Sequence, residues 1–147
     1  MSRYLPDGLS IPVPEADGLS APFWNGLKEE KVLVQRCAAC GEWQWGPEWL
    51  CHSCHSMTLD WVEVVPEGRI FSWQRSWHPV NPVLAGAVPY LVVLVELPGA
   101  GNIRMLGNLL GDPMQDVQIG APVKGVFEHG TNADHVFTLL QWEAASA

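Results

Sequence analysis

The chain has 147 residues, enough for one average domain or two small ones. Hydrophobic residues make up 48% of it and charged residues only 16%, which argues against disorder outside the ends of the chain. The net charge of -8 disfavours nucleic acid as a partner, because binding a phosphate backbone requires clustered lysines and arginines. Twelve prolines and fourteen glycines favour short strands joined by turns, and so a mainly β protein.

Residues 1–21 are predicted to form a flexible arm, because Pro6, Pro12 and Pro14 block regular structure there. Two interpretations stay open. The arm is either a disordered tail or a segment that lies along a partner. In the second case its contacts are apolar or aromatic side chains, namely Tyr4, Leu5, Leu9, Ile11 and Val13.

The chain shows no targeting or membrane-spanning segment. Its best apolar run, Tyr90–Pro98, has the length of a strand, and the N-terminus lacks the apolar core of a signal peptide. We therefore expect no membrane span and a cytoplasmic location. Structural disulfides are rare in such a reducing compartment, so the cysteines are expected to act as thiolates.

A helix and a cysteine-rich segment are predicted to form the second unit, residues 22–62. Ser20 can cap the helix, Pro22 suits its first turn, and Phe23 and Leu27 share one face. A strand over residues 31–37 then leads into the cysteines.

All four cysteines lie in two Cys-x-x-Cys pairs separated by ten residues; they are Cys37, Cys40, Cys51 and Cys54. Each pair can supply two thiolates from one tight turn, and tetrahedral zinc requires four. The residue after the second cysteine of such a turn often has a positive φ, which Gly41 and His55 can adopt. The spacing predicts a structural zinc ion in a rubredoxin-like ribbon, although iron in the same cage fits the spacing too.

A four-thiolate site has no open coordination position, so we expect the metal to stabilise the ribbon without taking part in catalysis. Two disulfides conflict with the missing export signal, and neither pair has the helix that follows a thioredoxin-like redox pair. His52 or His55 is a conceivable substitute ligand, but four cysteines already complete the site.

Residues 63–147 are predicted to form a five-stranded OB-fold barrel. Gly107 suggests a bulge, residues 98–102 a hairpin turn, and residues 111–120 one helical turn capped by Asp112. The five predicted strands are Gly68–Trp77, Tyr90–Leu97, Ile103–Leu110, Pro122–Glu128 and His135–Trp142.

No nucleophile with a matching base, and no phosphate-binding glycine loop, is found in the sequence, so no catalytic residue is predicted. His78 is the histidine best placed for a functional loop, and His129 and His135 flank another loop. Eight tryptophans exceed the needs of one small core, and tryptophan is enriched at interface hot spots. The aromatic residues expected at a partner interface are Phe23, Trp24, Trp43, Trp45, Trp49 and Trp77.

The order of these parts resembles the zinc-ribbon plus OB-fold family of acyl-CoA-associated proteins, long known only as a domain of unknown function. The resemblance covers residues 22–142. It rests on the aromatic helix, the two cysteine pairs, the entry strand from Trp61 to Trp73, and a run of residues in the next strand. That run matches at Pro89, Tyr90, Val92, Leu94, Val95, Glu96 and Leu97. The chain departs from the family pattern at His55, at Pro66 and Glu67, and in its proline-rich arm.

The resemblance implies a non-catalytic accessory subunit in a hetero-oligomer with a thiolase-like enzyme, acting on acyl-CoA thioesters. The partner would condense, cleave or transfer acyl groups, as in steroid side-chain degradation, and acyl-CoA would be contacted within the complex. Arg69, Arg75 and Arg104 are candidates for contacts with CoA phosphates, although surface salt bridges explain them equally well. Two rival hypotheses are a single-stranded nucleic-acid-binding module and an iron-containing redox protein.

Overall fold

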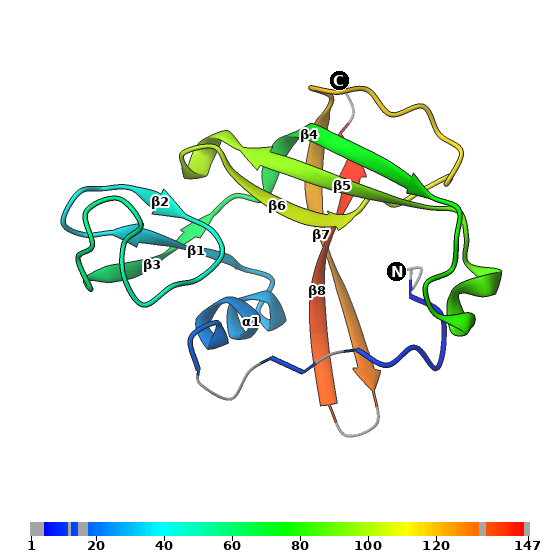
Figure 1. Ribbon diagram of the computed structural model, residues 1–147, viewed down its shortest axis with the longest axis horizontal. Coiled ribbons are helices and arrows are strands. Elements are labelled where there is room, and N and C mark those ends of the chain that lie inside the picture. The colour runs from blue at the N-terminus through cyan, green and yellow to red at the C-terminus, as the bar shows by residue number, and fades with distance from the viewer. Residues whose placement is uncertain (1–4, 12, 15–17, 133–134, 146–147) are drawn as a thin grey trace.

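The computed structural model describes residues 5–11, 13–14, 18–132 and 135–145. Tyr4, one of the predicted arm contacts, lies outside these residues. A short helix and a small three-stranded sheet lie beside a larger five-stranded sheet (Figure 1). This arrangement confirms the predicted mainly β architecture, in which one helix and a ribbon precede an OB-fold region.

The single α-helix within the described residues, α1, spans Ala21–Lys28 and buries one face against the rest of the molecule. Phe23 and Leu27 are buried, as their spacing predicts. Pro22 lies in the first turn, where its missing N–H costs nothing. Ser20 stands at the N-cap position, but its side chain makes no capping hydrogen bond. The helix therefore depends on packing more than on its cap.

The ribbon sheet has the strand order β2-β1-β3. β1 (Val32–Cys37) is central and pairs antiparallel with both β2 (Trp43–Gln44) and β3 (Leu59–Val64). Val32 and Val34 of β1 are buried beneath α1 and the larger sheet. The cysteine turns extend from the far end of this sheet (Figure 1).

The larger sheet has the strand order β6-β5-β4-β7-β8, and all its neighbouring strands are antiparallel. Its strands are β4 (Glu67–Ser76), β5 (Tyr90–Leu97), β6 (Ile103–Asn108), β7 (Pro122–Asn132) and β8 (His135–Ala144). The sheet does not close completely: β6 and β8 are not paired as strands, and the residue just after β6, Leu109, forms an isolated parallel bridge with Trp142 of β8. β7 ends at Asn132 where the sequence predicted Glu128, β8 ends at Ala144 where it predicted Trp142, and the two strands form a long hairpin (Figure 1).

A β-bulge interrupts β4 at Phe71. Ile70 pairs with Val95 and Ser72 with Leu94, so Phe71 is the extra residue between them. A bulge shifts the side-chain alternation by one position. Ile70 is buried and Trp73 is half-buried, although strict alternation would put residues 70 and 73 on opposite faces of the strand. The sequence predicted simple alternation here, and the bulge is the reason that the strand departs from it.

Two connections in the larger sheet also differ in detail from their sequence patterns. The turn between β5 and β6 contains a short 3-10 helix, Pro98–Ala100, and ends on Gly101 with a φ of +63°. Residues 111–120 form turns and not the predicted helical turn. Asp112 nevertheless accepts a hydrogen bond from the N–H of Met114, so it organises the turn locally.

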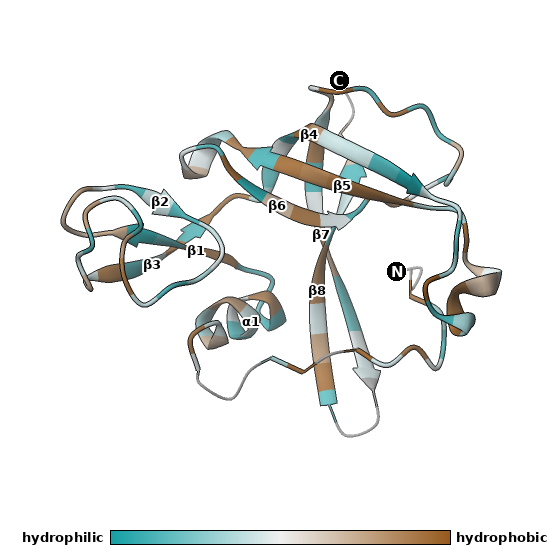
Figure 2. Cartoon of the chain, viewed as in Figure 1, coloured by the Kyte–Doolittle hydropathy of each residue, from teal (hydrophilic) through white to brown (hydrophobic). Residues whose placement is uncertain are grey.

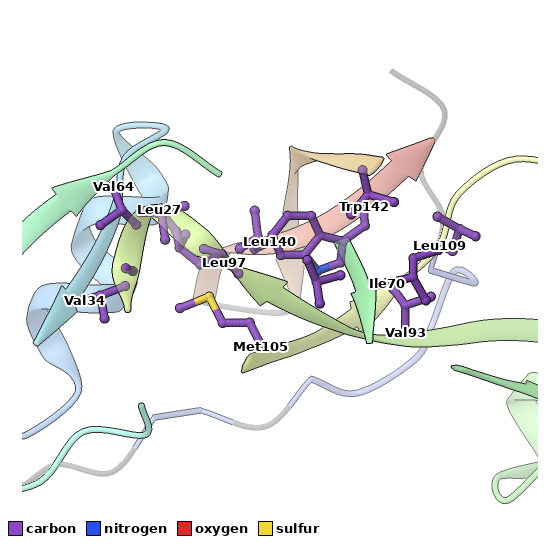
Figure 3. Packing of buried hydrophobic residues seen from close by; sticks show 14 of the residues in the cluster. Leu27, Val34, Val64, Ile70, Val93, Leu97, Met105, Leu109, Leu140 and Trp142 are labelled. Carbon is purple, nitrogen blue, oxygen red and sulfur yellow. The ribbon is translucent and has the colours of Figure 1, made fainter. Parts of the chain in front are cut away.

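One continuous core joins the ribbon, the helix and the larger sheet (Figure 3). Leu27, Val34 and Val64 lie at its ribbon end, and Trp142 lies among strands of the larger sheet (Figure 3). β5 alternates fully buried and half-buried residues, and it is among the most hydrophobic segments in Figure 2. No helix within the described residues is long and apolar enough to cross a membrane.

Candidate functional site

The four cysteines lie together at the tip of the ribbon, as their spacing predicts. Their sulfur atoms all lie within 4.8 Å of one another. The sulfurs of Cys37 and Cys54 are 3.6 Å apart, as are those of Cys40 and Cys51. In a tetrahedral site with metal–sulfur bonds of the usual length, neighbouring sulfurs lie about 3.8 Å apart. The donor set and its spacing therefore fit a tetrahedral thiolate-bound metal.

Two similar turns place the sulfurs. The N–H of Gly41 donates to the carbonyl of Cys37 at 2.8 Å, and the N–H of His55 donates to that of Cys51 at 3.0 Å. Gly41 has a φ of +77° and His55 a φ of +61°. The left-handed conformation expected at both positions is thus confirmed. Histidine tolerates it less readily than glycine, so the second turn is the more strained one.

Backbone N–H groups and burial set the protonation of the metal-free thiols. The N–H of Cys40 lowers the pKa of Cys37 to about 7, and the N–H of Cys54 lowers the pKa of Cys51. For Cys40, the N–H of Glu42 lowers the pKa, but burial and the other three thiols outweigh it and raise the pKa to about 12. A bound cation would favour the thiolate form of Cys40 against this rise in its pKa.

Two buried glutamines fix the loop between the cysteine pairs, and the sequence reading missed both. Gln35 and Gln44 are each 3% exposed, and the side-chain amide of Gln44 donates to the Gln35 side-chain oxygen. The same oxygen accepts the N–H of Glu48, and the Gln44 oxygen accepts the N–H of His52. Gln35 stands in the apolar strand Val32–Cys37, and that setting was the available sequence signal.

Most of the aromatic residues expected at a partner interface pack within the chain. The Phe23 ring lies 4.5 Å from the Trp45 ring and 5.0 Å from the Trp24 ring, measured between centroids. Trp43 packs against Gly101 in the turn between β5 and β6. These contacts join the ribbon, the helix and the larger sheet. Trp49 and Trp77 remain outside the core, with 56% and 61% of their surfaces exposed.

A hollow of about 450 Å³ lies where the ribbon, α1 and the open side of the larger sheet meet. Phe23, Trp24 and Trp45 line one side of it. Met105 and Leu140, from β6 and β8, are among the residues on its other side. We call this space the seam hollow, because it opens beside the place where β6 and β8 separate.

The histidines outside the ribbon form no catalytic group in the described part of the chain. His78 is exposed in the loop after β4, and His135 is exposed at the start of β8. The Nδ1 of His129 lies 2.9 Å from the Thr138 hydroxyl, and its Nε2 lies 3.0 Å from a Glu30 carboxylate oxygen. His129 thus links the hairpin to the end of α1.

Two of the three candidate arginines are engaged within the chain. Arg75 donates to the carbonyls of Pro113 and Gln115, both at 2.8 Å. Arg104 donates to Glu96 at 3.1 Å, and its guanidinium lies 3.6 Å from the centre of the Phe71 ring. The side chain of Arg69 has no hydrogen bond or ion pair among the residues that the structure describes.

Arg69 lines a second hollow, of about 400 Å³, together with Lys124. Lys124 forms an ion pair with Glu143 at 2.9 Å. Among the three candidate arginines, Arg69 therefore has the guanidinium most available to an anionic ligand.

Two family models match the chain. The rubredoxin-like zinc ribbon domain of ChsH2 matches residues 24–60, and the C-terminal OB-fold domain of ChsH2 matches residues 61–128. Together they cover the ribbon and most of the larger sheet.

Two curated proteins are similar in sequence. A probable enoyl-CoA hydratase alpha subunit of Thermomonospora curvata is 34% identical over 112 residues, covering 76% of this chain and 34% of that protein. The 3-oxo-4,17-pregnadiene-20-carboxyl-CoA hydratase alpha subunit of Mycobacterium tuberculosis is 31% identical over 122 residues, covering 83% and 37%. The chain thus spans about a third of the length of these relatives.

Two solved structures are among those similar in fold to this chain. A chain of an Ltp2-ChsH2(DUF35) aldolase superposes with a TM-score of 0.76 at 32% identity, covering 92% of this chain and 100% of that one. A DUF35 protein of unknown function from Sulfolobus solfataricus has a TM-score of 0.59 at 17% identity, covering 88% and 87%. The second likeness concerns the fold alone.

Proposed function

The chain belongs to the ChsH2 family, whose members join a rubredoxin-like zinc ribbon to an OB-fold domain, and on this basis we propose that it is an accessory subunit of an acyl-CoA-processing enzyme complex. Its partner would be a thiolase-like enzyme that forms or cleaves a carbon–carbon bond next to a CoA thioester. The observation that carries this proposal is the 32% identity over the full length of a chain from an aldolase complex.

The four cysteines would bind one zinc ion with a structural role. Cys37, Cys40, Cys51 and Cys54 supply four sulfurs in a tetrahedral spacing, so zinc bound there has no vacant position for water or substrate. When bound, the ion supplies folding energy to a ribbon that has little core of its own. Zinc rather than iron agrees with the domain description that matches residues 24–60.

The catalytic groups would lie in the partner. In the described part of this chain the thiols form the metal cage, and His78 and His135 are exposed without a partner nucleophile shown beside them. The Thr138 hydroxyl lies beside His129, but Thr138 is only 2% exposed and is therefore shielded from a substrate. Trp49 and Trp77 are the candidate rings that remain exposed for partner contact. Arg69 is the arginine best placed to contact a CoA phosphate, because Arg75 and Arg104 already bond within the chain.

Co-expression with a thiolase-like protein encoded beside this chain tests the proposal. A stable complex should co-purify, and its C–C cleavage or condensation activity should fall when this subunit is removed. Recovery of the chain as a monomer beside a fully active partner would reject the accessory role. Salt-sensitive binding of single-stranded oligonucleotides would instead support the nucleic-acid module, against which the charge of -8 argues.

A further inference from the structure

A buried relay of hydrogen bonds runs from the N-terminal arm to the edge of β6. The N–H of Leu5 donates to Oε1 of Glu128 at 3.0 Å. The side-chain amide of Gln141 donates to Oε2 of the same carboxylate at 2.9 Å, and the Gln141 oxygen accepts the N–H of Asn108 at 2.8 Å. Asn108 in turn donates from its side chain to the carbonyl of Leu91. The relay thus connects the arm with β7, β8, β6 and β5.

The relay is built from side chains that are expensive to bury without partners. Glu128 is 8% exposed and Gln141 is 2% exposed. A carboxylate at that depth must be satisfied by hydrogen bonds, and the arm supplies one of its donors. If the Leu5 donor leaves, water can reach the Glu128 carboxylate and compete with the Gln141 amide for it. The bond from Asn108 to Gln141 is then weakened, because the Gln141 side chain loses its fixed orientation once water competes for the Glu128 carboxylate.

The arm also forms part of the wall of an apolar hollow at the end of the larger sheet. Leu5 and Leu9 line a hollow of about 370 Å³ together with Leu84, Pro89 and Tyr90. Figure 1 shows the described parts of the arm running from the short helix that holds Leu84, past the lower end of the β7–β8 hairpin, to α1. Leu5 therefore lies beside apolar residues of the hollow and also donates a main-chain hydrogen bond to Glu128.

Asn108 links the two ends of this arrangement. Asn108 lines the hollow that the arm borders, and it also lines the seam hollow with Gln141. Beyond Asn108, the described strands β6 and β8 are held together by the Leu109–Trp142 bridge and by the N–H of Leu110, which donates to the carbonyl of Trp142. The hydrogen bond from the Asn108 N–H to the Gln141 side chain is thus the last described polar contact before the two strands separate.

We propose that residues 5–9 act as a strap whose docking onto Glu128 sets how far the seam between β6 and β8 opens. With the strap docked, Gln141 is oriented to hold Asn108 and the seam stays narrow. With the strap released, the relay loses its outer donor and the seam hollow widens. A partner that captures the arm would thereby change a hollow on another face of the same sheet. The inference concerns the isolated chain and is independent of the partner's identity.

A matched pair of substitutions at one position tests the strap. Leu5→Pro removes the N–H donor, because proline has none, and leaves Glu128, Gln141 and Asn108 unchanged. Leu5→Ala shortens the side chain but keeps the donor. Amide hydrogen exchange of the full chain, followed by mass spectrometry, reports on the arm, on seam residues 104–109 and 138–142, and on ribbon residues 43–50 as an internal reference.

Leu5→Pro should raise exchange in the arm and, by about fivefold, in both seam segments, with the ribbon unchanged. Leu5→Ala should change the seam segments by less than roughly twofold. Three results would overturn the proposal. These are a released arm with wild-type seam exchange, equal seam exchange in the two variants, and an arm that stays protected in Leu5→Pro. Glu30→Gln, which removes a carboxylate beside His129 outside the relay, should leave the seam as in the wild type.

Discussion

Trp43 of the ribbon packs against Gly101, the left-handed residue of the turn between β5 and β6. A Cβ built on Gly101 would lie 2.7 Å from Cδ1 of the indole. The two residues are far apart in sequence, and their contact packs the ribbon against the larger sheet. A glycine is needed at this place for two reasons: the close approach of the ring and the φ of +63°.

Gly101→Ala should destabilise the protein by about 2 kcal/mol, because the new methyl group overlaps the indole and the backbone is strained. Thermal or urea unfolding measures the effect. Gly99→Ala is the matched control two residues away. A Cβ there meets no atom within 4 Å, and its cost should stay near 0.5 kcal/mol. Equal costs for the two variants would show that Trp43 does not depend on Gly101.

Cys54→Ala should abolish stoichiometric metal binding, because three thiolates with one open position bind zinc less well than four. Elemental analysis of the purified chain should find about one zinc for the wild type and much less for the variant. The ribbon should also lose protection from proteolysis. His52→Ala is the control: this side chain is exposed and lies outside the four-sulfur group, so zinc content should be unchanged. A red, redox-active wild-type protein would mean iron.

The exposed and packed tryptophans should behave differently when they are removed. Trp49→Ala and Trp77→Ala should each change the free energy of unfolding by no more than about 0.5 kcal/mol, since both rings are largely solvated. Trp45→Ala should cost about 3 kcal/mol, because its ring packs on Phe23. If Trp49 and Trp77 contact the partner, their variants should bind it more weakly at unchanged stability. Unchanged affinity in both would remove these rings from the interface.

Arg69→Gln should weaken acyl-CoA binding in the complex, since Arg69 is free of ion pairs and hydrogen bonds among the described residues. The expected result is a rise in KM of roughly tenfold, the effect of losing one charge-assisted hydrogen bond. Arg104→Gln is the comparison, because that side chain is already bonded to Glu96. Equal KM values for wild type and Arg69→Gln would exclude a contact with CoA phosphate.

Several features of this protein follow from local sequence. The two cysteine pairs determine their turns, because each pair closes within a few residues and needs only a left-handed residue after it. Gly41 and His55 adopt that conformation. The strand patterns likewise determined the order of elements, and the helix face with Phe23 and Leu27 was readable from its spacing.

The tertiary structure decided which side chains are exposed for contact with a partner and which are packed within the chain. Trp43 and Trp49 look alike in the sequence, but one packs on Gly101 and the other is exposed. The bulge at Phe71, the buried pair Gln35 and Gln44, and the link from Leu5 to Glu128 also escape sequence reading. The physical reason is the same for all of them. Local chemistry fixes a turn or a strand, whereas burial and hydrogen-bond partners depend on segments that meet only when the chain folds.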